Sequence, residues 1–253
     1  MINLIRVELF KLRKNRSYWV LVFTIAAISL LYPLLYYFDR QNSGTLQYTG
    51  IEFLLTFLSS NAYVLKFGVA VLAGFFISNE YSTGVMKTIA SSGHTRGQLF
   101  TAKLLVFAVG AMALSLVFPV VSTIEVTMLS GFGNVPEGVS LFFLPRTLGL
   151  TLLYTAGYAA IGALFTVILT DSGKTISFLV IFFIMIDMAL AAIGSKVAFV
   201  DTVYDYSIFK LVADIGKPSI DSGDWSAILL VPLLTFVGCG LLGILVFRRK
   251  EIK

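Results

Sequence analysis

The chain has 253 residues, of which 57% are hydrophobic and only 13% are charged. Ordinary soluble domains hold a smaller apolar share and about 25% charged residues, so this composition excludes a soluble globular domain. The net charge of +5 would also suit a nucleic-acid-binding protein. In so apolar a chain the position of the charges matters more than their sum, and we expect membrane lipid, and no nucleic acid, as the partner of this surface.

Six apolar segments are long enough to cross a bilayer, which takes about 20 residues. We place them at 18–38, 62–78, 99–129, 144–169, 176–193 and 227–247. The third is longer than one straight crossing needs, and Pro119 within it predicts a kink. The expected fold class is an all-α polytopic membrane bundle of six transmembrane helices, with residues 1–253 forming a single transmembrane domain.

The basic residues predict the orientation of this bundle. If both termini are cytoplasmic, the inner segments hold 13 Lys and Arg residues and the outer segments hold five. Basic residues close to the ends of spans are retained on the cytoplasmic side. We therefore expect cytoplasmic N- and C-termini in a multi-pass protein of the plasma membrane.

Two regions outside the spans also have a helical pattern. In residues 1–17, helical spacing separates the apolar Ile2, Ile5, Leu9 and Leu12 from the basic Arg6, Arg13 and Lys14. This pattern predicts an amphipathic interfacial helix, which would be either a membrane-surface anchor or a docking element beside a cytoplasmic partner. The outer loop 194–226 mixes apolar and acidic residues, and we expect it to contain a short amphipathic helix that caps the outer end of the bundle.

Most enzymatic functions are excluded by the residues present. His94 is the only histidine, and it lies in a connection between spans, so zinc-protease and histidine-based nucleophile sites have no ligands or base. Residues 171–175 end like a phosphate loop, but Ile168 stands where that motif requires its first glycine. No catalytic residue, metal or cofactor is expected, and the chain is predicted not to be an enzyme on its own.

The most informative segment joins the second and third spans, at 79–98. It begins with Glu80 at the membrane exit, continues through the Thr83-Gly84 pair and Lys87, and reaches Arg96 before Lys103 enters the next span. In this pattern, in the six spans and in the amphipathic start, the chain resembles the permease subunits of type-2 ABC exporters. Among them it is most similar to the permeases of bacterial bacitracin and lantibiotic immunity exporters.

This resemblance implies that 79–98 is a cytoplasmic coupling helix, which docks on a separate ABC ATPase subunit. The implied ATPase-coupling residues are Glu80, Thr83, Gly84, Lys87 and Arg96. The resemblance further implies a second permease copy or a related permease as partner, export of a peptide antibiotic or another amphipathic substrate, resistance to that antibiotic, and a bacterial cell membrane.

Lys66, Glu125 and Asp187 lie inside the second, third and fifth predicted spans. Charges at such depth are costly, about 2.5–3.5 kcal/mol each on insertion scales, so they should face the bundle interior or a cavity and be paired. With a rise of about 1.5 Å per residue, Lys66 and Asp187 reach a similar height above the inner face and are plausible partners. The three residues would form a structural ion pair or snorkel outward, or they would serve the substrate path.

Two other functions are compatible with this sequence. An ion-gradient-driven secondary transporter could use Lys66, Glu125 and Asp187 as coupling groups, although no inverted repeat is visible. A non-transporting membrane sensor or structural protein is the second alternative. A neighbouring reading frame for a phosphate-loop ATPase would favour the exporter over both.

Overall fold

The computed structural model describes residues 1–44, 47–90, 93–134, 142–217, 220 and 224–250. Within these ranges all regular structure is helical. The α-helices are α1 (Ile2–Lys14), α2 (Arg16–Ser43), α3 (Gly50–Leu72), α4 (Asn79–Ser82), α5 (Val85–Ala90), α6 (Arg96–Ser130), α7 (Phe143–Leu169), α8 (Ser172–Gly194), α9 (Ala198–Asp205), α10 (Ile208–Leu211) and α11 (Trp225–Arg249). A π-helical segment, Ala73–Ser78, joins α3 to α4, and a 3₁₀ segment, Val212–Gly216, follows α10.

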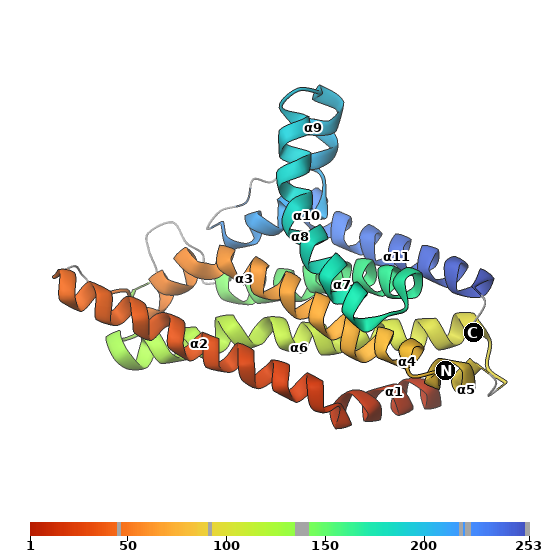
Figure 1. The fold of residues 1–253 in the computed structure, drawn as a ribbon. Coiled ribbons are helices and arrows are strands. Elements are labelled where there is room, and N and C mark those ends of the chain that lie inside the picture. The colour runs from red at the N-terminus through yellow and green to blue at the C-terminus, as the bar shows by residue number, and fades with distance from the viewer. Residues whose placement is uncertain (45–46, 91–92, 135–141, 218–219, 221–223, 251–253) are drawn as a thin grey trace.

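Six of these helical stretches are long and apolar enough to cross a membrane. They are Arg16–Ser43, Asn61–Ser82, Arg96–Ser130, Phe143–Leu169, Ser172–Gly194 and Trp225–Arg249. The predicted all-α polytopic bundle of six spans is therefore confirmed. The N-terminus and the C-terminal end lie at the same end of the molecule (Figure 1), which we call the inner end because the basic residues gather there.

The helices α6 and α7 form the centre of the bundle. α6 packs against α2, α3, α7 and α11, and α7 also packs closely against α11. Small residues on α7 permit its neighbours to approach closely. A side-chain carbon at Gly157 would lie 2.5 Å from Ile208, and one at Gly162 would lie 3.2 Å from Val69.

The third span is one continuous α-helix that contains Pro119. The helix runs through Pro119 without a break, and the bend of its axis there stays a prediction. Pro119 is buried, and close to it the Ser122 hydroxyl donates to the Phe118 carbonyl at 2.6 Å. Within this span the proline is thus accommodated by the packing around it.

The second span changes its helical form before it reaches the inner end. In the π-helical segment, Gly74 lies against Ile176 at the start of α8, where a side-chain carbon would be 2.3 Å from Ile176 Cγ1. One turn further, the Ser78 hydroxyl donates to Thr175 Oγ1 at 2.9 Å. The wider π turn therefore provides the contact surface for the inner end of α8, a common use of π segments at functional positions.

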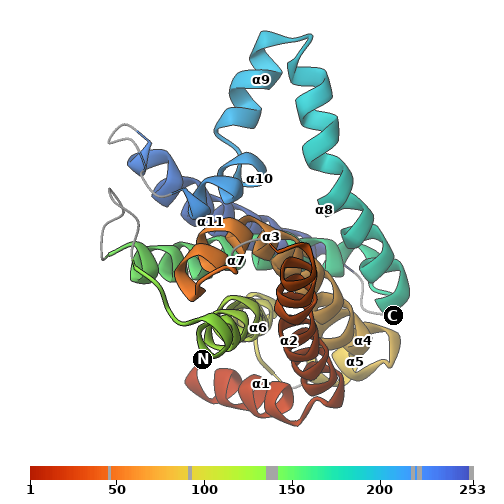
Figure 2. The same cartoon turned by 90° about the vertical axis from the view of Figure 1, so that its left-hand side faces the viewer.

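The helix α8 then leaves the bundle. With α9 it forms a hairpin that projects away from the other helices in both views (Figures 1 and 2). The chain returns through α10 and the 3₁₀ segment, where Ile208, Leu211, Val212 and Ile215 are buried against the bundle. The described part of the outer loop thus contains the expected short helix as α9, and its α10 portion reaches deeper than a cap, since Ile208 lies beside Gly157 in the middle of α7.

Candidate functional site at the inner end

The described part of the predicted coupling helix 79–98 holds two short helices, of which α4 ends the second span and α5 follows it. Gly84, with φ +74°, separates α4 from α5, a conformation that residues with a side chain rarely adopt. Thr83 closes α4 by donating its hydroxyl to the Asn79 carbonyl at 2.7 Å. Residues 91–92 of the predicted coupling helix lie outside the described residues, and Arg96 already belongs to α6.

The helix α5 has one face against the bundle and one face turned away from it. Met86 is only 2% exposed and lines a small apolar space together with Leu99 and Phe100 of α6. Val85 and Lys87 are exposed on the other side, as are Thr83 and Gly84. Three of the five predicted coupling residues, Thr83, Gly84 and Lys87, therefore lie on a free surface.

Glu80 has a different environment, because it belongs to a ring of four charged side chains. Lys103 Nζ lies 2.6 Å from Glu80 Oε2 and 2.7 Å from Glu8 Oε2. Lys11 Nζ lies 2.6 Å from Glu8 Oε1 and 3.1 Å from Glu80 Oε1. Acidic and basic groups alternate around this ring, which we call the inner ion ring, and it joins α1, α4 and α6.

Two of the four charged side chains in the inner ion ring are buried. Glu8 is 5% exposed and Lys103 is 4% exposed. Charges removed from water are stable only when they are paired and hydrogen-bonded, and each of these two has two partners of opposite charge. The Lys103 ammonium also lies 5.1 Å from the centre of the Phe76 ring in the π-helical segment.

The pKa values of the two α1 groups reflect this pairing. Burial by itself would raise the pKa of Glu8, but the ammonium groups of Lys103 and Lys11 outweigh it and hold the pKa below its ordinary value. Burial would lower the pKa of Lys11, but its contacts with Glu8 and Glu80 raise that pKa instead. Both shifts favour the charged forms of Glu8 and Lys11.

Arg96 is likewise engaged within the chain. Its Nη1 donates to the carbonyls of Arg248 at 3.2 Å and Lys250, at the C-terminal end of α11. Lys250 Nζ in turn donates to the carbonyls of Val167 and Ile168 at the end of α7. Cations at helix C-termini satisfy carbonyls that have no partner within the helix and complement the helix dipole. Arg96 thus fastens the inner ends of α6 and α11.

The helix α1 forms where it was predicted, and its position at the membrane interface stays a prediction. Leu12 is buried against α6, where a side-chain carbon at Gly110 would lie 2.8 Å from it, whereas Ile2 and Leu9 are exposed. Glu8 and Lys11 also occupy the inward face. Sequence reasoning missed Glu8, Lys11 and Lys103 as site residues. An acidic residue four positions before Leu12, on the bundle-facing side of a short basic helix, was the available signal.

The structure brings together two of the three intramembrane charges. Lys66 of α3 and Asp187 of α8 form an ion pair, in which the Lys66 side chain is 7% exposed and that of Asp187 is 28% exposed. Lys66 Nζ also lies 5.8 Å from the centre of the Tyr158 ring. Glu125 is separate, on the outer part of α6, and its Oε2 atom is buried without a hydrogen-bond partner in the described part of the chain.

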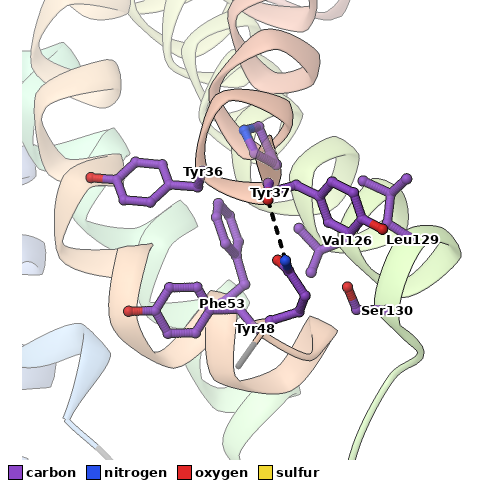
Figure 3. Close-up of a pocket in the computed structure, with 9 residues that line it drawn as sticks. Tyr36, Tyr37, Tyr48, Phe53, Val126, Leu129 and Ser130 are labelled. Atoms are coloured by element: carbon purple, nitrogen blue, oxygen red, sulfur yellow. Dashed lines mark hydrogen bonds between the residues drawn. The ribbon is translucent and has the colours of Figure 1, made fainter. Parts of the chain in front are cut away.

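A further pocket lies at the outer end of α2. It is lined mainly by aromatic and apolar side chains, among them Tyr36, Tyr48 and Phe53 (Figure 3). Its free space is ≈ 10 Å³, about the minimum for one water molecule. The rings pack against each other there, with Tyr48 and Phe53 centred 6.5 Å apart, so this is an aromatic core and not a ligand site. Among the described residues no three potential metal ligands gather.

Comparison with known proteins identifies the family. A search of curated proteins gave no match. The sequence model of the family described as "ABC-2 family transporter protein" matches residues 4–188, about three quarters of the 253 residues. The match begins in α1, includes the whole inner ion ring and the segment α4–α5, and ends one residue after Asp187. The chain therefore belongs to the ABC-2 family of transporter proteins.

Proposed function

We propose that this protein is the membrane-spanning permease subunit of an ATP-driven ABC exporter, whose ATP is hydrolysed by a separate cytoplasmic ATPase subunit. The observation that carries the proposal is the exposed face of α5, which lies at the inner end of an ABC-2 family bundle whose sequence has no phosphate loop. Membership of the family implies an ATPase partner in general. The exposed side chains of α5 supply a surface for it.

The docking surface in this proposal consists of Thr83, Gly84, Val85 and Lys87. Lys87 is its exposed cation, and a charged group at the rim of an interface steers association and fixes orientation. Glu80 and Arg96 act one step behind this surface, because their charged groups are bound to Lys103 and to the end of α11. They hold α4 and α5, which we call the docking segment, in place and do not have to touch the ATPase.

The substrate proposed is an amphipathic molecule such as a peptide antibiotic, exported to give resistance. Apolar side chains cover the faces of α2, α8 and α11, which suits a substrate that partitions into lipid. A second permease copy, or a related permease, would complete the path. The projecting α8–α9 hairpin leaves much of α8 exposed in the single chain, which supports an assembly of two.

Co-purification with the ATPase tests this function. The permease should retain a phosphate-loop ATPase encoded beside it, and Lys87→Glu should weaken that retention. Lys174→Glu is the matched control, because Lys174 is an exposed lysine that belongs to another helix, at the inner start of α8. If both variants retain the ATPase as well as the native chain does, the docking surface is not on α5.

A further inference from the structure

The backbone on either side of α4 is not regular α-helix. On one side, α4 follows the π-helical segment, and on the other, Gly84 at φ +74° separates α4 from α5. Both are points at which the regular α-helical backbone is interrupted. The backbone alone therefore fixes the orientation of α5 less firmly than an unbroken helix would.

Side chains supply the missing constraint. Met86 attaches α5 to the bundle beside Leu99 and Phe100, and the inner ion ring attaches α4 through Glu80. The ring does not end at α6, since Lys103 and Lys11 both contact Glu8 as well. Because each carboxylate bridges two ammonium groups, a displacement of α4 changes the contacts of α1 and α6 together.

The more buried of the two acids in this ring is on α1. Glu8 is 5% exposed and interacts with both lysines, whereas its neighbours Val7 and Leu9 are exposed. A surface anchor needs no buried acid on its inner face, since apolar side chains would hold it to the bundle without the cost of desolvating a charge. Glu8 thus has a role that an anchor does not explain.

We propose that Glu8 is a positioning residue of the docking segment. Through Lys103 and Lys11 it holds Glu80, so that α1, α4–α5 and the inner end of α6 move as one unit. α6 is a continuous helix of 35 residues from this ring to the outer end of the bundle. A displacement of α5 therefore moves α6, which spans the whole membrane. The positioning itself stands on the geometry of the ring, and its use in coupling rests on the proposed function.

The positioning is tested first on the full permease, without an ATPase. Spin labels are attached at Val7→Cys on α1 and Lys87→Cys on α5, both exposed, after Cys239→Ser removes the native thiol. Electron–electron double resonance then gives the distribution of distances between the two helices. We expect Glu8→Gln and Lys11→Met to broaden this distribution.

Lys14→Met is the matched control, because Lys14 is an exposed lysine on the same helix outside the ring. It should leave the distribution unchanged. Reversal of all four charges (Glu8→Lys, Lys11→Glu, Glu80→Lys, Lys103→Glu) preserves the alternation and should restore a narrow distribution. Unchanged widths in both Glu8→Gln and Lys11→Met would overturn the positioning role, whether or not the reversed chain folds.

The coupling is tested on the complex with the ATPase, with unlabelled variants. Since the ATP site belongs to the partner, Glu8→Gln should lower the kcat of permease-stimulated hydrolysis about fivefold to tenfold and leave the KM for ATP unchanged. Glu8→Asp keeps the charge and should recover most of the rate. Full stimulation by Glu8→Gln would overturn the coupling role. Failure of the native chain to bind any ATPase would instead refute the proposed function, and the distance measurement would still decide the positioning.

Discussion

The inner ion ring and the intramembrane pair place buried charge in the same bundle in two different ways. In the ring, every charged group has two partners of opposite sign, and Glu8, Lys11, Glu80 and Lys103 join three helices. In the pair, Lys66 and Asp187 have one charged partner each. Asp187 Oδ1 in the pair and Glu80 Oε2 in the ring both lack a hydrogen bond in the described chain, so the two sites differ in the number of charged partners. Each charge in the ring keeps an ion pair when one partner is lost, whereas each charge in the intramembrane pair does not.

This difference determines how each site responds to the loss of one charge. If a lysine of the ring is removed, both acids still contact the other lysine. If an acid is removed, both lysines still contact the other acid. Removing a member of the pair leaves a single charge at membrane depth, where the penalty is largest. The comparison predicts that the pair is the more fragile site for folding, and the ring the more important one for coupling.

The largest expected effect is the loss of one partner of the pair. Lys66→Met or Asp187→Leu should each lower stability by about 3–5 kcal/mol, because the other charge is stranded. The double variant should recover much of this loss, since no isolated charge remains. Thermal melting of the three variants in detergent checks this. Additive losses would show that the contact between the two residues contributes nothing.

A smaller loss is expected for the most buried lysine of the ring. Lys103→Met should cost about 1.5–3 kcal/mol, the range for hydrogen bonds to charged groups, because Lys11 still contacts both Glu8 and Glu80. The same substitution at the exposed Lys87 is the control and should leave the melting temperature unchanged. If Lys103→Met lowered stability as much as Lys66→Met, the second lysine of the ring would not compensate for the lost ion pairs.

The effect expected for Arg96→Ala is smaller again. The variant removes a cation from the end of α11, where such a group contributes about 0.3–1 kcal/mol. Hydrogen exchange of the last turn of α11 should become faster, while the core of α7 keeps its protection. Equal exchange in the native chain and the variant would mean that the Arg96 contacts do not hold this end.

The smallest effect is a dependence of stability on pH. Because Glu8 has a lowered pKa in the folded protein, it binds protons less readily there than in the unfolded chain, whose ordinary value is 4.5. Its stabilising contribution is therefore complete above pH 4.5 and is lost as the pH falls through the lower folded value. The melting temperature of Glu8→Gln should fall less on acidification than that of the native chain. Parallel curves would contradict the pairing of Glu8.

The fold could be predicted from the sequence to a large extent, because hydrocarbon imposes a strong pattern. Each span needs about 20 apolar residues and satisfies its own backbone, so the six spans were visible without tertiary information. Lys66 and Asp187 could be paired from helical rise alone, since both lie in regular helices. Gly84 marked a break between helices only after the structure showed its positive φ.

The inner ion ring could not be predicted, because it depends on which face of α1 meets the bundle. Periodicity identified Ile2, Ile5, Leu9 and Leu12 as one face, and it gives no sign that Glu8 is buried against the bundle beside Leu12. The contacts between Glu8 and Lys103 join residues 95 positions apart. Such a contact is fixed by three helices at once and leaves no local pattern in any of them.

ATP hydrolysis in liposomes tests the central claim most directly. The partner ATPase is measured alone, with the native permease, and with the Lys87→Glu permease at the same lipid composition. The account predicts slow hydrolysis by the ATPase alone, faster hydrolysis with the native permease, and a loss of this stimulation with Lys87→Glu but not with Lys174→Glu. Equal rates with and without the native permease, together with transport by the permease alone under an ion gradient, would contradict it.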